Sequence, residues 1–386
     1  MAIPRVSIGN KLFLRDASVP KEGMVMKQMT RREFGLLGAA GALAASSGIP
    51  FATSAASAAT ASTEFDLTPY VHPELRPFLA PMRQYLATTP PLSSQTLAAR
   101  RKGNMARPPL ASPPYVERTI PGRAGAPDVR VYVVNSTAGG APRAAILHTH
   151  GGGFVLGDAK ASLNAIQEVA LALDCVIVTV DYRLAPETRF PGSLEDNYAG
   201  LKWLYQNADE LGVDRSRIAL MGESAGGGHA AMLAIAARDR GEVPLLYQAL
   251  IYPMLDDRTG STRKTPPYMG AVIWTPEANR FGWTSLLGVP AGSARVPYGA
   301  VPARIRDLRG LPPAFIGVGS IDLFVDEDID YARRLIDAGV PTELNVVPGA
   351  FHGFDFVGTT SIAKQFKSAL IAALASALKL KNPEQG

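Results

Sequence analysis

The chain has few residues that bind metal ions or form covalent cross-links. Its 386 residues include one cysteine, Cys175, and five histidines. A single cysteine excludes an intramolecular disulfide, and the apolar run 174–178 around it favours a buried, inert thiol. His148 and His150 have the spacing of two metal ligands, but no third ligand at a suitable spacing accompanies them. We therefore expect neither a metal ion nor an organic cofactor.

A basic surface for nucleic acid is also missing from most of the chain. The net charge is +5, but residues 1–58 contain seven basic and three acidic residues, so the remainder has an excess of only +1. That remainder has no basic tract. We therefore expect no nucleic-acid partner.

No apolar run in the sequence is long enough to cross a membrane. The longest one near the N-terminus, 36–49, has 14 residues rich in Ala and Gly. It follows the pair Arg31-Arg32 and precedes small-residue sites such as 56–58, which is the order found in export signals. Residues 1–58 thus resemble a twin-arginine signal peptide, which implies export to the periplasm or outside the cell and no stable membrane span after its removal. The alternative is a disordered extension.

The rest of the sequence predicts an α/β fold. From about residue 115, short β-branched runs alternate with longer amphipathic segments, as in a mostly parallel sheet with helices on both faces. We expect a catalytic domain over 115–380. Its expected strands are 129–134, 144–148, 176–180, 218–221, 249–251, 314–318 and 342–347, and its expected helices are 163–173, 194–211, 225–238, 327–338 and 362–378.

Two segments do not follow this alternation. Residues 59–114 are rich in proline, and residues 256–311 carry proline, glycine and aromatic residues where the next strand should come. Insertions of this size next to a sheet often cover an active site, so we expect both segments to form a cap. A disordered loop is the alternative for the second segment, but Trp274, Phe281 and Trp283 favour packing.

A candidate nucleophile lies between an expected strand and an expected helix, in Gly222-Glu223-Ser224-Ala225-Gly226. A sharp turn at this point holds a serine in a strained backbone conformation and exposes its hydroxyl at the edge of the sheet. Small neighbours such as Gly222 and Gly226 are needed because larger ones would clash. We therefore predict Ser224 as the nucleophile.

A candidate oxyanion hole follows the expected strand 144–148, in His150-Gly151-Gly152-Gly153-Phe154. Consecutive glycines allow backbone N–H groups to approach a ligand without obstruction by side chains. We expect Gly152 and Gly153, together with the N–H of Ala225, to bind the negative charge of a tetrahedral intermediate. His150 is expected to hold this loop in place through its ring nitrogens. The alternative is a flexible glycine turn, but this alternative does not explain why the glycines directly follow a strand.

Together with Asp181-Tyr182-Arg183-Leu184-Ala185-Pro186-Glu187, these motifs make residues 115–378 resemble the hormone-sensitive-lipase-like esterases, the bacterial family IV. The resemblance implies an α/β-hydrolase fold, a mostly parallel eight-stranded sheet with a cap. It also implies a preference for short acyl chains. Family members often pair through an edge strand, so the resemblance makes a homodimer one possible state of this chain. Glu223 departs from the family, which more often has Asp or Thr at this position.

The general base is predicted from the positions of the histidines. His352 lies after the last expected strand and before the C-terminal helix, where an α/β-hydrolase places its base. His352-Gly353-Phe354 is also the usual sequence of the resembling family. His72 is expected at the surface of the N-terminal cap, and His229 is expected in the core.

The orienting acid is expected after the preceding strand, and Asp322 is the first carboxylate there. Several acids compete with it, but their spacing suggests the first turn of the next helix, where the helix dipole favours negative charge. These competitors are Asp326, Glu327, Asp328 and Asp330. The resulting order of Ser224, Asp322 and His352 along the chain is that of the α/β-hydrolases.

We interpret the chain as a serine carboxylesterase that hydrolyses short acyl or aryl esters of small molecules through an acyl-enzyme. The same triad would also suit a deacetylase, a lactonase or an enzyme that cuts activated amides, and a noncatalytic hydrolase-fold binding protein is the alternative outside catalysis. Phe154, Trp274, Phe281 and Trp283 suggest a compact apolar pocket. They suit the packed core of a cap equally well.

Overall fold

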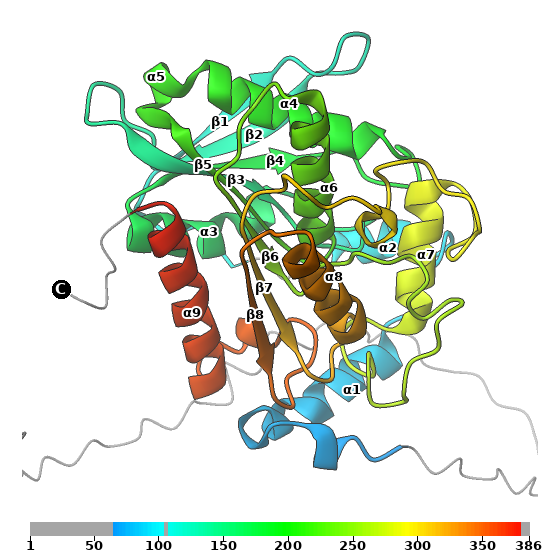
Figure 1. Cartoon of the computed structure of the whole chain (residues 1–386). Helices are drawn as coiled ribbons and strands as arrows, with labels where there is room; N and C mark the ends of the chain where they lie inside the picture. Colours follow the sequence, from blue (N-terminus) through cyan, green and yellow to red (C-terminus); the bar gives the residue numbers. More distant parts are fainter. Residues whose placement is uncertain (1–64, 104–106, 380–386) are drawn as a thin grey trace, which may run out of the picture. The chain divides into compact units, whose positions relative to one another are not determined.

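The computed structural model describes residues 65–103 and 107–379, which form one twisted sheet with helices on both faces (Figure 1). The predicted signal peptide lies outside these residues. The sheet order is β1-β2-β4-β3-β5-β6-β7-β8; β2 runs antiparallel to β1 and β4, and all other neighbours are parallel. The predicted mostly parallel α/β-hydrolase sheet is confirmed. The strands are β1 (Tyr115–Ile120), β2 (Val129–Val134), β3 (Arg143–Thr149), β4 (Val176–Asp181), β5 (Val213–Glu223), β6 (Tyr247–Ile251), β7 (Ala314–Gly319) and β8 (Thr342–Val347).

The helices cover the sheet in two layers, each with its own apolar core (Figure 1). Helices α4, α6 and α8 pack on one face, and α3 and α9 pack on the other. The α-helices are α1 (Leu79–Thr88), α2 (Leu97–Lys102), α3 (Leu163–Leu173), α4 (Gly192–Gln206), α5 (Ala208–Leu211), α6 (Ala225–Arg240), α7 (Pro276–Leu287), α8 (Val325–Asp337) and α9 (Ser361–Ala377). The short 3-10 helices are η2 (Thr68–Tyr70), η3 (Pro73–Phe78), η4 (Lys160–Ser162), η5 (Pro302–Arg304) and η6 (Phe354–Phe356).

The burial of the central strands explains why their sequences predict them well. All residues of β4 except the last are buried, as are all of β6 and β7. A parallel strand covered by helices on both faces has apolar residues on both sides, so it appears in the sequence as an uninterrupted apolar run. Because these strands are parallel, their carboxyl ends meet at one edge of the sheet, where the predicted motifs lie.

The structure differs from the expected elements in several places: helix α7 lies where no helix was expected, and β5 begins five residues before the expected strand 218–221. Strand β1 was not predicted, because it is an edge strand on which only Ile120 is fully buried, so its sequence lacks an apolar pattern. The expected helix 194–211 is divided into α4 and α5, which meet at Asn207. The carbonyl oxygen of Trp203 accepts from both the side-chain amide of Asn207, at 2.8 Å, and its backbone N–H, at 2.9 Å.

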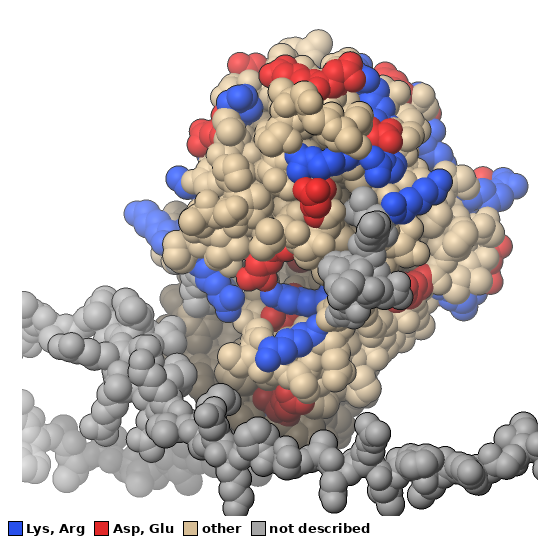
Figure 2. All heavy atoms as spheres, turned by 90° about the vertical axis from the view of Figure 1, so that its left-hand side faces the viewer, with Lys and Arg blue, Asp and Glu red and all other residues tan. Residues whose placement is uncertain are grey.

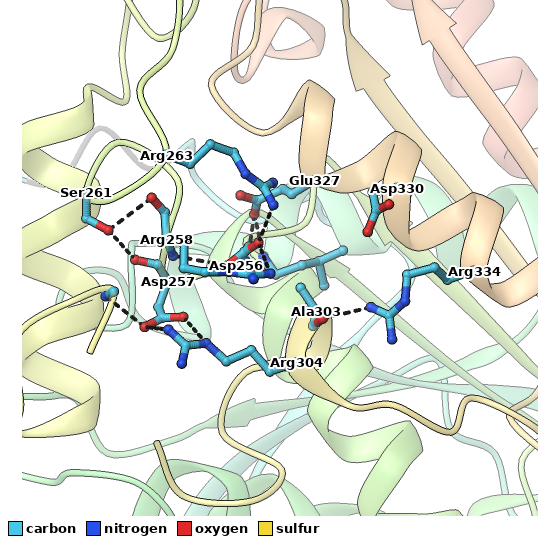
Figure 3. A network of polar contacts seen from close by, with 12 residues as sticks. Asp256, Asp257, Arg258, Ser261, Arg263, Ala303, Arg304, Glu327, Asp330 and Arg334 are labelled. Atoms are coloured by element: carbon cyan, nitrogen blue, oxygen red, sulfur yellow. Dashed lines mark hydrogen bonds and ion pairs between the residues drawn. The ribbon is translucent and has the colours of Figure 1, made fainter. Parts of the chain in front are cut away.

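The insertion between β6 and β7, residues 252–313, is closed at its base by a buried ion pair (Figure 3). Asp257 lies where the insertion leaves the sheet, and Arg304 lies where it returns. The two carboxylate oxygens of Asp257 accept hydrogen bonds from Nε and Nη2 of Arg304, both at 2.7 Å. Asp257 is completely buried. This bidentate pair joins the two ends of the insertion.

Helix α8 holds the same two ends through backbone groups (Figure 3). Oε1 of Glu327 accepts hydrogen bonds from the N–H groups of Leu255 and Asp256, at 2.7 and 3.1 Å. On the other side, Arg334 donates to the carbonyl oxygen of Ala303 at 2.7 Å. The base of the insertion is therefore attached to the helix that follows the predicted catalytic acid.

Within the described residues, no helix is both long enough and apolar enough to cross a bilayer. The face of the molecule drawn in Figure 2 carries Lys and Arg side chains interspersed with Asp and Glu among neutral residues. On this face the charge is mixed in sign.

Candidate active site

The structure places Ser224 at a sharp turn between β5 and α6. Its backbone has φ 57° and ψ −121°, a conformation that is costly for a residue with a side chain. The surroundings hold this turn in place, because the Ser224 N–H donates to the carbonyl oxygen of Ile251, and the Ser224 carbonyl oxygen accepts from the N–H of Met254. The neighbouring glycines allow the close approach, since a Cβ on Gly226 would lie 2.0 Å from the carbonyl oxygen of Thr149 and one on Gly222 would lie 2.4 Å from that of Gly226.

Ser224, His352 and Asp322 lie in one hydrogen-bonded row. Oγ of Ser224 is 2.9 Å from Nε2 of His352, and Nδ1 of His352 is 2.8 Å from Oδ2 of Asp322. The second carboxylate oxygen of Asp322 accepts from the N–H of Phe324 at 3.0 Å. Asp322 is completely buried, and Ser224 and His352 are 8% and 5% exposed. This row has the geometry of a serine nucleophile, a base and an orienting acid.

Two aromatic rings fix the orientation of the His352 imidazole. Tyr252 and Phe324 meet it edge-on, with ring centroids 4.8 and 5.2 Å away. The Tyr252 hydroxyl donates to Oδ1 of Asp355 at 2.9 Å. Burial raises the pKa of the Asp355 carboxyl. The contact joins the end of β6 to the loop that carries His352.

The glycine loop after β3 lies between the insertion and the nucleophile turn. Gly152 and Gly153 have φ angles of 126° and 60°, where glycine is favoured. A Cβ on Gly153 would lie 2.0 Å from Cη2 of Trp274, so the indole rests directly on this residue. A Cβ on Gly151 would lie 3.0 Å from the carbonyl oxygen of Glu223. The loop thus needs glycine for its conformation and for both of its contacts.

Ala225 is the first residue of α6, directly after Ser224. Its N–H lies at the N-terminus of a helix, where the helix dipole favours negative charge. The positions of Gly152, Gly153 and Ala225 suit the predicted oxyanion hole. Their role stays a prediction.

His150 and His229 occupy an aromatic cluster beneath the glycine loop. The His150 ring stacks on Tyr182 at 4.1 Å, its Nδ1 is 2.8 Å from the carbonyl oxygen of Gly151, and burial lowers its pKa. His229 is completely buried, with Nδ1 3.1 Å from the carbonyl oxygen of Ala225 and Nε2 2.9 Å from the Ser193 hydroxyl. Burial lowers the pKa of His229 to about 3, so its ring is neutral.

The aromatic residues predicted to line the pocket have different surroundings. Phe154 and Trp283 are buried and pack against each other, with ring centroids 4.8 Å apart. Trp274 contacts the glycine loop and donates from Nε1 to Asn279 at 3.2 Å. Phe281 is half-buried against the same core. Phe154 is itself the last residue of the predicted oxyanion motif, and the Trp274 indole lies against Gly153 from the insertion.

The N-terminal segment also reaches the predicted site. The His72 N–H donates to the carbonyl oxygen of Gly349 at 2.9 Å, three residues before His352. Arg101 donates to the carbonyl oxygen of Val155 at 2.8 Å, just after the glycine loop. Through these contacts and that of Trp274 with Gly153, both segments lie beside the predicted site; the cap itself stays a prediction.

The competing acids after Asp322 have unequal surroundings. Asp326 is exposed, but Glu327 and Asp328 are buried, and burial raises both of their pKa values well above the ordinary range. The helix dipole alone does not explain two buried acids. The sequence carries a signal for the burial of Asp328, since Val325, Asp328 and Leu335 follow helical spacing and lie on one buried stripe.

The sequence reasoning did not find two further polar residues near the site. Tyr252 follows β6 and contacts His352, and Glu223 pairs with His148 across the sheet. No local pattern marks either contact, because the partners lie 75 or more residues apart. Within the described residues, no group of three or more His, Cys, Asp or Glu side chains is placed to hold a metal ion.

Comparison with known proteins places the chain in a family. A family model described as alpha/beta hydrolase fold matches residues 146–356. The carboxylesterase NlhH of Mycobacterium tuberculosis is 33% identical over 314 residues, which are 78% of this chain and 97% of that protein. The chain belongs to the hormone-sensitive-lipase-like esterases of the α/β-hydrolase family.

Two further matches are also named as ester-hydrolysing enzymes. An ethyl acetate hydrolase of Pseudomonas putida is 33% identical over 241 residues, 59% of this chain and 70% of that protein. Among solved structures, a bacterial heroin esterase is 35% identical with a TM-score of 0.68, and the match covers 80% of this chain and 98% of that one. Within this family, the chain is assigned to the carboxylic ester hydrolases.

Proposed function

We propose that the chain is a serine carboxylesterase that hydrolyses short acyl or aryl esters through an acyl-enzyme on Ser224. The observation that supports this most directly is the buried row from Oγ of Ser224 through His352 to Asp322, with contacts of 2.9 and 2.8 Å. The strained turn at Ser224 adds support, because such strain is typical of an exposed nucleophile.

In the proposed acylation step, Oγ of Ser224 attacks the ester carbonyl carbon while Nε2 of His352 takes its proton. The carbonyl electron pair moves to oxygen, where the N–H groups of Gly152, Gly153 and Ala225 receive the charge. The intermediate then collapses, and the carbon–oxygen bond to the alcohol breaks. The leaving alkoxide takes the proton from Nε2.

In the proposed deacylation step, water attacks the acyl-enzyme, and Nε2 of His352 accepts its proton. Collapse of the second intermediate releases the acid and returns the proton to Ser224. Throughout, Nδ1–H of His352 donates to Asp322, which stabilises the imidazolium and selects the tautomer with a free lone pair on Nε2. Burial of Asp322 strengthens this interaction, because water does not compete for the carboxylate.

The short acyl or aryl preference rests on the relatives and on the cap. One relative is named for ethyl acetate and one solved structure for heroin. In this chain the Trp274 indole lies against Gly153, so bulk is already present beside the loop that would receive the carbonyl oxygen. We expect this contact to leave room for small acyl groups.

Covalent labelling tests the proposed nucleophile. We expect a fluorophosphonate probe to add once to the native chain, on the peptide that contains Ser224, and not to the Ser224→Ala variant. The pre-unfolded chain is the control, because its serine lacks the base. Labelling of a different residue, or no labelling of a chain that hydrolyses esters, would contradict the proposal.

We also propose that residues 1–58 direct export by the twin-arginine route. The support is the order of Arg31-Arg32, the apolar run 36–49 and the small residues 56–58. Replacing both arginines with lysine is expected to abolish export in a host that has this translocase. Equal export of the two forms would refute the proposal.

Pairing of two copies through the edge strand β8 is proposed on the family resemblance. Leu344 in this strand is 37% exposed. Light scattering is expected to give the mass of a dimer, and a monomeric mass at micromolar concentration would refute it.

A further inference from the structure

A second carboxylate–histidine pair lies directly behind the nucleophile turn, and the ester chemistry described above does not use it. Oε2 of Glu223, at the end of β5, is 2.9 Å from Nε2 of His148 on β3. Nδ1 of His148 is 2.8 Å from the Thr179 hydroxyl on β4. The three side chains form a hydrogen-bonded line across three neighbouring strands.

This line is embedded in the apolar core beneath α3 and α9. His148 and Thr179 are completely buried, and the Glu223 side chain is 22% exposed. Their neighbours on the same face include Ile146 and Met221. Apolar side chains in these positions would avoid the cost of desolvating polar groups, so core stability alone does not account for the line.

The ends of the line coincide with the segments that build the predicted site. Glu223 directly precedes Ser224, and His148 lies two residues before His150, where the glycine loop begins. From β4, the Tyr182 hydroxyl donates to the carbonyl oxygen of His150 at 2.6 Å. The line thus joins the nucleophile turn to the strand that leads into the glycine loop.

We propose that Glu223, His148 and Thr179 act as positioning residues, which fix Oγ of Ser224 relative to the oxyanion glycines. The inference rests on the proposed esterase function. Geometry also accounts for glutamate at this position, because aspartate is shorter by one carbon–carbon bond, about 1.5 Å. Its carboxylate would not reach Nε2 of His148.

The test compares Glu223→Ala, Glu223→Gln, His148→Phe and the Glu223→Ala/His148→Phe double variant on a p-nitrophenyl ester. Loss of the contact is expected to lower kcat about tenfold in each alanine or phenylalanine variant, with KM within about twofold, because small misplacement of a reacting atom costs rate more than binding. Glu223→Gln is expected to keep kcat near wild type, since its amide oxygen still accepts from Nε2–H. Glu210→Ala, at an exposed glutamate of α5, is the control.

Two readouts separate positioning from a general loss of stability. The inhibition constant of phenylboronic acid, which bonds to Oγ, is expected to rise by the same factor as kcat falls. The double variant is expected to be no worse than either single variant, because both remove one interaction.

A kcat of Glu223→Ala equal to that of Glu210→Ala, an equal loss in Glu223→Gln, or multiplicative effects in the double variant would overturn the inference. If His148→Phe does not fold, the two Glu223 variants still test the inference, because the Glu223 side chain is partly exposed and its replacement is tolerated more easily. Turnover that survives Ser224→Ala would instead refute the proposed function.

Discussion

Removal of the Arg304 guanidinium is expected to destabilise the chain strongly. Methionine keeps the stem of this side chain but leaves Asp257, which is completely buried, without its charge partner. Breaking a buried ion pair in this way costs about 3–5 kcal/mol in the free energy of unfolding. For a domain of this size, with an unfolding entropy of about 2.1 cal/mol/K per residue, that cost lowers Tm by roughly 5–8 °C.

Arg309→Met supplies a matched control for this prediction. Arg309 also forms a bidentate pair, with Asp307, but these side chains are 78% and 56% exposed. An exposed pair contributes little, so Tm is expected to stay within about 2 °C of wild type. Thermal unfolding followed by circular dichroism measures both variants. Equal shifts in Arg304→Met and Arg309→Met would refute the reasoning from burial.

The cost of Arg304→Met is also expected to depend on pH. Burial raises the pKa of Asp257 and the Arg304 guanidinium opposes this increase, so without Arg304 the folded state binds a proton more readily. A group with a raised folded pKa contributes stability at low pH that is lost as the pH rises. The difference in Tm from wild type should therefore be smaller at pH 5 than at pH 8. A difference that does not change with pH would show that Asp257 does not carry the penalty.

Three further variants test the site and its surroundings. In Gly153→Ala the new Cβ would meet Trp274, so kcat is expected to fall about 10²-fold; Gly125→Ala, which has a similar φ of 81° and no atom within 4 Å, should keep wild-type kinetics. In Asp322→Asn the Phe324 N–H retains the amide oxygen, so the amide NH2 faces Nδ1 of His352 and favours the wrong imidazole tautomer; kcat should fall about 10⁴-fold with little change in KM, and a loss below tenfold would contradict the proposed role. Burial raises the pKa of Asp328 well above its ordinary value, so stability from this proton is lost as the pH rises. Above about pH 4, the free energy of unfolding of Asp328→Asn should therefore rise relative to that of wild type by up to about 1.4 kcal/mol per pH unit, as measured by calorimetry. A constant difference in this free energy between about pH 5 and 8 would refute the prediction.

The sequence predicts those parts of the fold that have local causes. The buried strands β4 and β7 appear as apolar runs, and the glycine motifs lie directly after β3 and β5. Since parallel strands end at one edge of the sheet, these positions already bring the motifs together. Strand β1 was missed because its exposed residues carry no apolar period.

The contacts that were missed join residues far apart in the chain. Glu223 and His148 are 75 residues apart, and Asp257 and Arg304 are 47 apart. Each residue alone resembles an ordinary surface charge or a core histidine. Only strand order and the path of the insertion bring the partners together, and no local pattern encodes them.

The hydrolysis of p-nitrophenyl esters from acetate to palmitate by the chain and by Ser224→Ala tests the central claim most directly. We predict turnover that is highest for the short esters and disappears in the variant, because Oγ of Ser224 is the proposed attacking atom. Folded wild-type protein without turnover of any ester, or an active Ser224→Ala variant, would contradict the account.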